Sequence, residues 1–350
     1  MRAILTAIHP AKHASHWASG TVLQVLLLLC CIVTASVVVA KPLDDADIER
    51  VLKEAHAKFK NVKDGANANY IPALDEVDSE LFAISLVTPD GRVFDVGDSK
   101  HQFSIQSISK AFVAATVIEA QGPDTVLEKI GVDATGQPFN SIEAIEMISE
   151  RSVNPLVNAG AMASVSLVKG ATPDEKWAKI AGGLDAFAGR KLTVLEDIYA
   201  SESATNDRNQ AIAKLLDAYG RLYDDVATTV DLYTRQCSVG VTSHDLAVMA
   251  GTLAAGGKNP VTGQQVIAAE NVPEVLAVMA TAGLYDDSGI WLYNVGLPAK
   301  SGVGGGIVAV APGEYGIAAF SPRLDVAGNS VRAQLAIDYI AEQLGGNIFE

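Results

Sequence analysis

Runs of consecutive apolar residues lie near both ends of the chain, and each run is followed by a turn sequence and a second run. Residues 81–96 contain two such runs around Thr88-Pro89-Asp90-Gly91, and residues 306–320 contain two around Ala311-Pro312-Gly313-Glu314. Pro and Gly at these positions favour a tight reversal of the chain, so each segment predicts a β-hairpin. Because an isolated hairpin is not stable in water, we expect both ends of the chain to join one antiparallel sheet.

The segments between and beside the hairpins show the spacing of apolar residues that is typical of helices. Residues 44–60 and 104–121 each predict one helix, and most of residues 140–290 predicts further helices separated by Gly and Pro. A last helix is expected near residues 330–344, with Gly345 as its stop. Its inward-facing residues are expected to be Val331, Leu335, Ile340 and Leu344.

This order of elements predicts an α+β fold. Strands lie at both ends of the body, so a sheet subdomain is expected from about residues 41–105 and 290–350. The helical subdomain, about residues 106–289, is then an all-helical insertion into the sheet subdomain. The terminal helices are expected to pack on the sheet.

The first forty residues differ from the body. Residues 1–21 contain basic residues and no acid, residues 22–40 are almost purely apolar, and a polar sequence begins at Lys41. This order is typical of a secretory signal peptide, here cleaved after Ala40. The apolar run is also near the length that spans a bilayer, so an uncleaved membrane anchor is the alternative. We expect an exported or membrane-anchored protein, or a cytoplasmic one if the start codon is misassigned.

Composition and charge remove several classes of protein. The chain has 26 basic and 41 acidic residues, whereas a general nucleic-acid binder needs a basic face. Its cysteines, Cys30, Cys31 and Cys237, form no Cys/His cluster with metal-ligand spacing, and no phosphate-binding glycine motif is present. We therefore expect no nucleic-acid partner, no metal and no organic cofactor.

Candidate chemistry begins in the helix predicted at residues 104–121. Ser107 and Lys110 are three residues apart, so on a helix both side chains point the same way. A serine hydroxyl becomes a good nucleophile when a base takes its proton, and a lysine can be that base when burial lowers its pKa. The start of a helix also favours developing negative charge. Alone the pair is a weak signal, because ordinary surface helices carry the same spacing.

A second motif strengthens the first. Lys300-Ser301-Gly302 enters a predicted strand, and such a triplet accompanies Ser-x-x-Lys in the serine enzymes that recognise penicillin. We expect Lys300 to supply local positive charge and the small residues to let the backbone approach a substrate. The backbone N–H groups of Val303 and Ser107 would then bind a carbonyl oxygen as it becomes an oxyanion.

With these motifs in place, the chain resembles the bacterial and mitochondrial-type serine glutaminases, which share the β-lactamase/DD-peptidase-like fold. Asn154-Pro155-Leu156-Val157-Asn158 is one characteristic stretch. The others, in family order, are residues 70–74, 103–112, 139–141, 201–202, 208–209, 237–239, 284–289, 295–307 and 321–331. The resemblance covers nearly all of residues 65–332.

The resemblance implies hydrolysis of L-glutamine to L-glutamate and ammonia by a glutaminase domain at residues 41–350, without a cofactor and as a homotetramer. It implies Ser107 as nucleophile, Lys110 as its base and Tyr285 as a carrier of protons. The implied substrate contacts, besides Ser107 and Tyr285, are Tyr70, Gln106, Asn158, Glu202, Asn209, Tyr233 and Val303. Their residue types suit a free amino acid, because Glu202 can pair with an ammonium while amide and hydroxyl groups bind a carboxylate.

Two other functions remain open at this point. Ser152-Val153-Asn154 has the Ser-x-Asn spacing of β-lactamases, which keeps a penicillin-recognising acylase as an alternative. A non-catalytic, exported glutamine-binding protein would keep the pocket but would not need Ser107 and Lys110.

Overall fold

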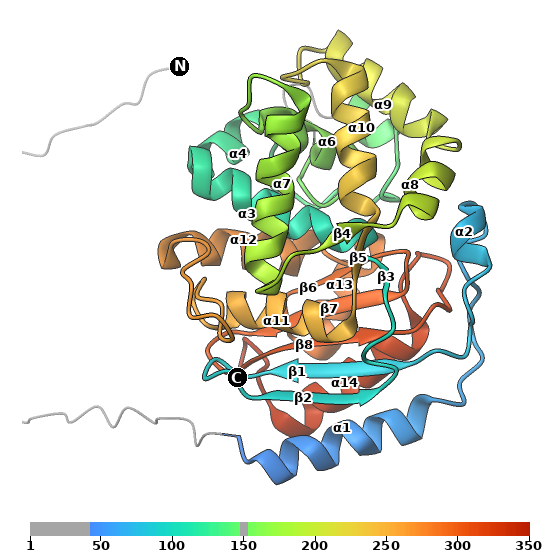
Figure 1. The fold of residues 1–350 in the computed structure, drawn as a ribbon, viewed down its shortest axis with the longest axis vertical. Coiled ribbons are helices and arrows are strands. Elements are labelled where there is room, and N and C mark those ends of the chain that lie inside the picture. The colour runs from blue at the N-terminus through green and yellow to red at the C-terminus, as the bar shows by residue number, and fades with distance from the viewer. Residues whose placement is uncertain (1–42, 148–152) are drawn as a thin grey trace, which may run out of the picture. The chain divides into compact units, whose positions relative to one another are not determined.

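The computed structural model describes residues 43–147 and 153–350, so the leader predicted at residues 1–40 lies outside the described residues (Figure 1). Within the described ranges, no helix is both long enough and apolar enough to cross a membrane.

Both predicted hairpins belong to one five-stranded antiparallel sheet, as the sequence indicates. Its strands, in spatial order, are β2 (Val93–Gly97), β1 (Ala83–Val87), β8 (Tyr315–Phe320), β7 (Gly306–Ala311) and β6 (Ala299–Ser301). The pairing of β1 with β8 joins the two ends of the body, with Ala83 opposite Phe320 and Val87 opposite Gly316. An α+β architecture with a central antiparallel sheet is therefore confirmed.

Helices cover both faces of this sheet, which explains why every residue of its central strands β1, β8 and β7 is buried. Alternate strand residues such as Ile84 and Ile317 pack into one core with α1 (Asp45–Phe59) and α14 (Val331–Leu344). The intervening residues pack into the other core with α11 (Ser243–Ala254). α11 lies very close to the sheet, because a Cβ on Gly316 would be only 2.0 Å from the backbone nitrogen of Gly251.

α11 lies within the predicted helical insertion in the sequence but covers the sheet in the structure. The sequence places residues 243–254 in the helical insertion, but α11 packs on β8, β1 and β7. Its strong helical pattern could not reveal which layer it covers.

The helical layer surrounds a fully buried helix, α6 (Asn158–Leu167), which contacts α3, α9 and α10 (Figure 1). Besides α6, the α-helices of the insertion are α3 (Ser109–Gln121), α4 (Pro123–Lys129), α5 (Glu143–Glu146), α7 (Pro173–Ala188), α8 (Glu196–Ser203), α9 (Asp207–Ala218), α10 (Val226–Cys237) and α12 (Val272–Ala282). α13 (Ser288–Val295) packs instead with α14 on the sheet side. A four-residue helix, α2 (Pro72–Asp75), precedes β1, and η2 (Ala269–Asn271) is a 3-10 turn.

Two local predictions need correction. The helix expected at residues 104–121 starts later, because Phe103–Ser104 forms strand β3 and Gln106–Ile108 forms the 3-10 helix η1. β3 belongs to a small sheet with β5 (Val239–Val241) and β4 (Thr193–Val194), and strands this short leave no recognisable sequence pattern.

The buried face of α14 also differs from the expected one. Of the four residues expected to point inward, only Ile340 is fully buried, and Leu335 is exposed. The buried positions are Arg332, Ala333, Ala336, Ile337, Ile340 and Ala341. Small alanines allow close packing on the sheet, whereas the expectation followed the larger apolar residues.

Candidate active site

Ser107 lies in the short connection between β3 and α3, where the backbone is tightly constrained. Gln106, the residue before it, has a φ of +50°, which non-glycine residues adopt rarely. The connection is fixed to β5 by a 2.8 Å hydrogen bond from the Ile105 N–H to the Val239 carbonyl. Ser107 is therefore presented from a rigid 3-10 turn rather than from a regular α-helix.

The loop after β6 approaches this turn so closely that it requires glycine. A Cβ on Gly304 would be 2.5 Å from the Ser104 carbonyl oxygen, and a Cβ on Gly302 would be 2.9 Å from that of Ile105. Val303, between these glycines, lines the same pocket as Ser107. The sequence predicted that these small residues let the backbone approach a substrate; in the structure they let it approach the turn that carries Ser107.

Lys110 is buried in the first turn of α3 and is held by a polar network behind the pocket. Its Nζ donates a 2.6 Å hydrogen bond to Asn158 Oδ1, which also accepts one of 3.1 Å from the Tyr233 hydroxyl. Asn158 Nδ2 in turn donates to Asn209 Oδ1 at 2.9 Å. Burial lowers the pKa of Lys110 to about 8, so an appreciable neutral fraction exists near neutral pH.

Tyr285 lies beside Ser107, on the 3-10 helix η3 (Tyr285–Asp287). Its hydroxyl donates to the Ser301 carbonyl at 3.3 Å, and its backbone also has a positive φ, +59°. Burial raises the pKa of Tyr285 to about 12, although a hydrogen bond with Ser107 acts in the opposite direction. Tyr285 therefore holds its proton in the resting state.

Lys300 contacts Tyr285 and is not among the residues that line the pocket. It is fully buried, and its Nζ donates to the carbonyls of Gly283 and Ser301 at 2.7 and 2.8 Å. The same atom lies 4.0 Å from the centre of the Tyr285 ring. Burial, together with the nearby Lys110, lowers the pKa of Lys300 well below its usual value.

Glu202 brings an acidic group to the pocket from α8. Burial raises the pKa of this carboxyl to about 7, while hydrogen bonds from Gln106 and Ser238 and the charge of Lys110 act to lower it. The Ser238 hydroxyl is 3.4 Å from Glu202 Oε2. A cationic ligand group next to Glu202 would favour its ionised form.

The structure brings the predicted site residues together around one pocket. Its lining includes Tyr70, Gln106, Ser107, Asn158, Glu202, Asn209, Tyr233 and Val303, while Lys110 and Tyr285 adjoin it through Asn158 and Ser107. Lining residues without a predicted role are Ile71, Phe139, Asn140, Thr205, Asn206, Arg208, Thr234 and Cys237. Several of these adjoin predicted contacts in the sequence, but spacing alone did not distinguish them from supporting residues.

Asn154, the described asparagine of the β-lactamase-like Ser-x-Asn triplet, does not line this pocket. Ser152 lies outside the described residues, and the Asn154 side chain is used by the backbone. Asn154 Nδ2 donates to the Asp133 carbonyl at 3.0 Å, and its Oδ1 accepts from the Leu156 N–H at 2.9 Å. Among the described residues, no group of three or more His, Cys, Asp or Glu is placed to hold a metal ion.

A family model described as Glutaminase matches residues 65–349. The chain belongs to the glutaminase family. This glutaminase is 57% identical over 302 residues to a glutaminase of Colwellia psychrerythraea, covering 86% of this chain and 97% of that protein. It is 53% identical over 305 residues to a glutaminase of Mycobacterium marinum, with 87% and 95% coverage.

A solved structure supports the same assignment at the level of the fold. The Bacillus subtilis glutaminase YbgJ superposes with a TM-score of 0.76 at 30% identity, over 87% of this chain and 99% of that one. That structure is a covalent complex with 5-oxo-L-norleucine, formed by reaction with 6-diazo-5-oxo-L-norleucine. This glutaminase therefore has the serine β-lactamase-like fold of its relatives.

Proposed function

We propose that this glutaminase hydrolyses L-glutamine to L-glutamate and ammonia through a γ-glutamyl ester on Ser107. The observation that carries the proposal is the placement of Ser107 in a pocket wall, with a buried lysine of pKa about 8 in the next turn and Tyr285 beside it. A buried lysine with a lowered pKa can act as the base that a serine nucleophile needs.

In the proposed acylation step, neutral Lys110 accepts the Ser107 proton while Oγ attacks the side-chain amide carbon of glutamine. The oxyanion that forms is bound by backbone N–H groups of Ser107 and Val303. Tyr285 passes the proton held by Lys110 to the leaving nitrogen, the carbon–nitrogen bond breaks, and ammonia departs. Lys110, neutral again, accepts a proton from water as the water attacks the ester. Glutamate is released, and the same proton returns to Ser107 Oγ.

The charges of the pocket fit the two ends of a free amino acid. Glu202 binds the substrate ammonium, and Asn158 and Asn209 offer amide N–H groups to the carboxylate. The Tyr233 proton points to Asn158 Oδ1 in the structure, so Tyr233 acts on the carboxylate mainly by holding Asn158. Tyr70 and Gln106 form parts of the wall that encloses the substrate.

Two measurements test the proposed nucleophile. Ser107→Ala should abolish ammonia release while thermal unfolding remains cooperative. Incubation with 6-diazo-5-oxo-L-norleucine should add mass to the wild-type peptide that carries Ser107 and leave Ser107→Ala unmodified. Full activity in Ser107→Ala, or labelling at another residue, would overturn the assignment.

Parallel assays with glutamine and nitrocefin separate a glutaminase from a penicillin-recognising acylase and from a non-catalytic binding protein.

We also propose that the protein is a homotetramer, because it resembles the bacterial serine glutaminases. Light scattering at working concentration tests this, and a monomer would contradict it.

We further propose that residues 1–40 export the protein or anchor it, because a basic region is followed by an apolar run. Mass spectrometry of the mature N-terminus distinguishes cleavage after Ala40 from a retained anchor.

Activity that survives chelation would agree with the expected absence of a metal.

A further inference from the structure

The segment from residue 62 to residue 80 reaches the pocket with very little regular structure of its own. It connects α1 to β1 and contains only the four-residue helix α2. Tyr70 and Ile71, near its middle, line the pocket beside Ser107. Because backbone without helix or strand is usually mobile, side-chain contacts must hold Tyr70 in place.

Two arginines of the C-terminal region fasten both ends of this segment. Arg332, which is completely buried, donates from Nε to the Val62 carbonyl at 2.7 Å. Its Nη1 donates to the carbonyls of Ser79 and Glu80, at 3.3 and 3.2 Å. One guanidinium therefore ties the start of the segment to its end.

Arg323 fastens the portion that leads directly toward Tyr70. Its Nη1 lies 3.2 Å from the Lys63 carbonyl and 3.4 Å from that of Gly65. A short antiparallel bridge between Ala66 and Leu324 continues this attachment along the backbone.

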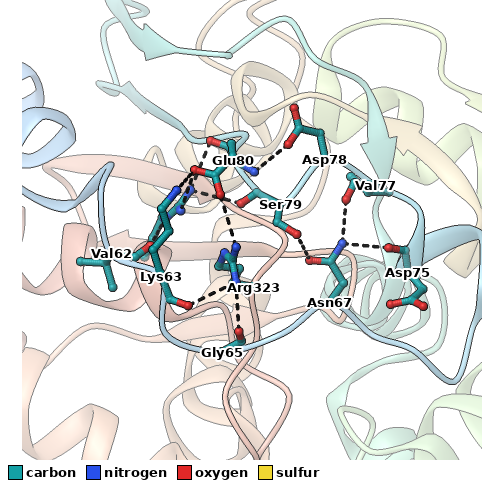
Figure 2. Close-up of polar contacts among 11 residues, drawn as sticks. Val62, Lys63, Gly65, Asn67, Asp75, Val77, Asp78, Ser79, Glu80 and Arg323 are labelled. Atoms are coloured by element: carbon teal, nitrogen blue, oxygen red, sulfur yellow. Dashed lines mark hydrogen bonds and ion pairs between the residues drawn. The ribbon is translucent and has the colours of Figure 1, made fainter.

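The Glu80 carboxylate joins these cations into one group, which we term the anchor cluster (Lys63, Glu80, Arg323 and Arg332). Figure 2 labels Lys63, Glu80 and Arg323. The carboxylate pairs with Lys63, lies 3.3 Å from Arg323 Nη2, and lies 3.7 Å from Arg332 Nη2. The hydrogen bond with Lys63, followed by the contacts of the two arginines, lowers the pKa of Glu80. The carboxylate is therefore charged at neutral pH and compensates the buried Arg332.

Asn67 closes the loop that contains Tyr70, and Figure 2 shows its contacts with Asp75, Val77 and Ser79. Its Nδ2 lies within 3.4, 3.2 and 2.7 Å of the carbonyls of Leu74, Asp75 and Val77. Its Oδ1 accepts a 3.0 Å hydrogen bond from the Ser79 hydroxyl. The side chain thus replaces the backbone ladder that this loop lacks.

The tip of the loop is seated against residues of the pocket itself. Ile71 is buried in a small apolar cluster with Val303. In α2, which follows Ile71, the Ala73 N–H donates to Ser201 Oγ at 3.4 Å. α2 therefore lies against α8, the helix that carries Glu202. Tyr70 lines the pocket but is itself 53% exposed, so its position depends on the chain on either side of it.

We propose that Asn67 and the anchor cluster are positioning elements for substrate binding, which act by holding Tyr70 at the pocket. This rests on the proposed function for the identity of the substrate, glutamine. Tyr70 would contact glutamine both before and during the reaction, so its displacement weakens binding in the ground state and the transition state alike. Loss of the anchor therefore raises KM and leaves kcat nearly unchanged.

Two isosteric variants test the proposal, each with a control. Asn67→Asp keeps the shape and replaces the donor to three carbonyls by an acceptor, whereas Ser79→Ala removes only the bond to Oδ1. Glu80→Gln removes the charge that joins the anchor cluster. Glu54→Gln makes the same change in a surface ion pair with Arg50 on α1. We expect Asn67→Asp and Glu80→Gln to raise KM for glutamine about tenfold, equivalent to about 1.4 kcal/mol. Ser79→Ala should have a smaller effect in the same direction, and Glu54→Gln none.

A double-mutant cycle tests whether the effect acts through Tyr70. Tyr70→Ala should itself raise KM, and addition of Asn67→Asp to it should have little further effect. Full additivity, or an unchanged KM in Asn67→Asp and Glu80→Gln, would overturn the proposal. If these two variants do not fold, a normal KM in Ser79→Ala overturns it.

Hydrogen exchange separates this proposal from the proposed function. Backbone amides of residues 66–77 should exchange faster in Asn67→Asp than in wild type, while those of α1 remain unchanged. Unchanged exchange at residues 66–77 would contradict the anchoring role whether or not glutamine is hydrolysed. A wild type that releases no ammonia from glutamine would instead overturn the proposed function.

Discussion

Lys110 and Asn158 are 48 positions apart in the sequence, and their side chains meet in a buried hydrogen bond of 2.6 Å from Nζ to Oδ1. Asn158 is the first residue of the buried helix α6, so the amide is held from behind by a rigid element. The contact holds the amine of Lys110 through a neutral amide, and burial outweighs the charge of Glu202, which acts to raise the Lys110 pKa. Lys110 can therefore be buried, positioned and still readily deprotonated.

The first prediction concerns the pH dependence of catalysis. Burial lowers the pKa of Lys110 to about 8, and only the neutral amine can accept the Ser107 proton. We expect kcat to rise with pH through about 8, which a pH–rate profile of ammonia release measures. Lys110→Arg should be inactive at every pH, because arginine stays protonated. A kcat that falls through the same range would argue against Lys110 as the base.

The second prediction concerns recognition of the substrate ammonium. Glu202→Gln keeps the shape of the side chain and removes the charge, and loss of one partner of a buried charge pair costs about 2–5 kcal/mol. We expect a correspondingly large fall in kcat/KM for glutamine, measured by steady-state kinetics, and no fall for Glu54→Gln. Wild type should ignore N-acetylglutamine, which lacks the ammonium. Equal hydrolysis of both compounds would require a different role for Glu202.

The third prediction concerns the close approach of the loop after β6. Ala at position 304 would place its Cβ 2.5 Å from the Ser104 carbonyl oxygen, so the loop or the Ser107 turn must move. Since a misplacement of about 1 Å can cost roughly 100-fold in rate, we expect Gly304→Ala to lose most activity. Gly289→Ala is the matched control, because a Cβ there meets no atom within 4 Å. Equal activity of the two variants would show that the close approach is not required.

The fourth prediction concerns stability and the ion pair between His244 on α11 and Asp95 on β2. Their side chains meet at 2.9 Å, and this hydrogen bond raises the pKa of His244. Burial acts to raise the pKa of Asp95, but hydrogen bonds from His244 and Ser85 outweigh it and lower that pKa.

Because the His244 pKa is higher in the folded state, its stabilisation is complete below about pH 6.5, the unfolded value, while Asp95 remains ionised. It is lost as the pH rises through the folded pKa of His244. The two side chains are 43% and 31% exposed, so we expect less than about 1 kcal/mol. Thermal unfolding should show His244→Gln to be less stable than wild type in mild acid and nearly equal in alkali. A deficit that grows with pH would contradict this interpretation.

The sequence by itself determined the features that depend on local spacing. The turns at residues 88–91 and 311–314 marked the two hairpins, and the placement of strands at both ends of the body indicated one antiparallel sheet. The spacing of Ser107 and Lys110 indicated a nucleophile and its base. The glycines around Val303 indicated a loop whose backbone approaches another group closely. Each of these motifs spans only a few residues, so it can be recognised from one sequence without knowledge of the fold.

Only the tertiary structure decided how distant groups meet. α14 turns its small alanines toward the sheet, which leaves Leu335 exposed, because close packing of backbones outweighed burial of one larger side chain. Lys300 turns to the carbonyls of Gly283 and Ser301 and not to the pocket, since a buried ammonium must find acceptors. Burial raises the pKa of Glu202 to about 7. Contacts between distant segments link Lys110 to Asn158 and attach residues 62–80 to Arg323 and Arg332. Such contacts have no periodicity in the sequence, so only the folded arrangement of the chain determines them.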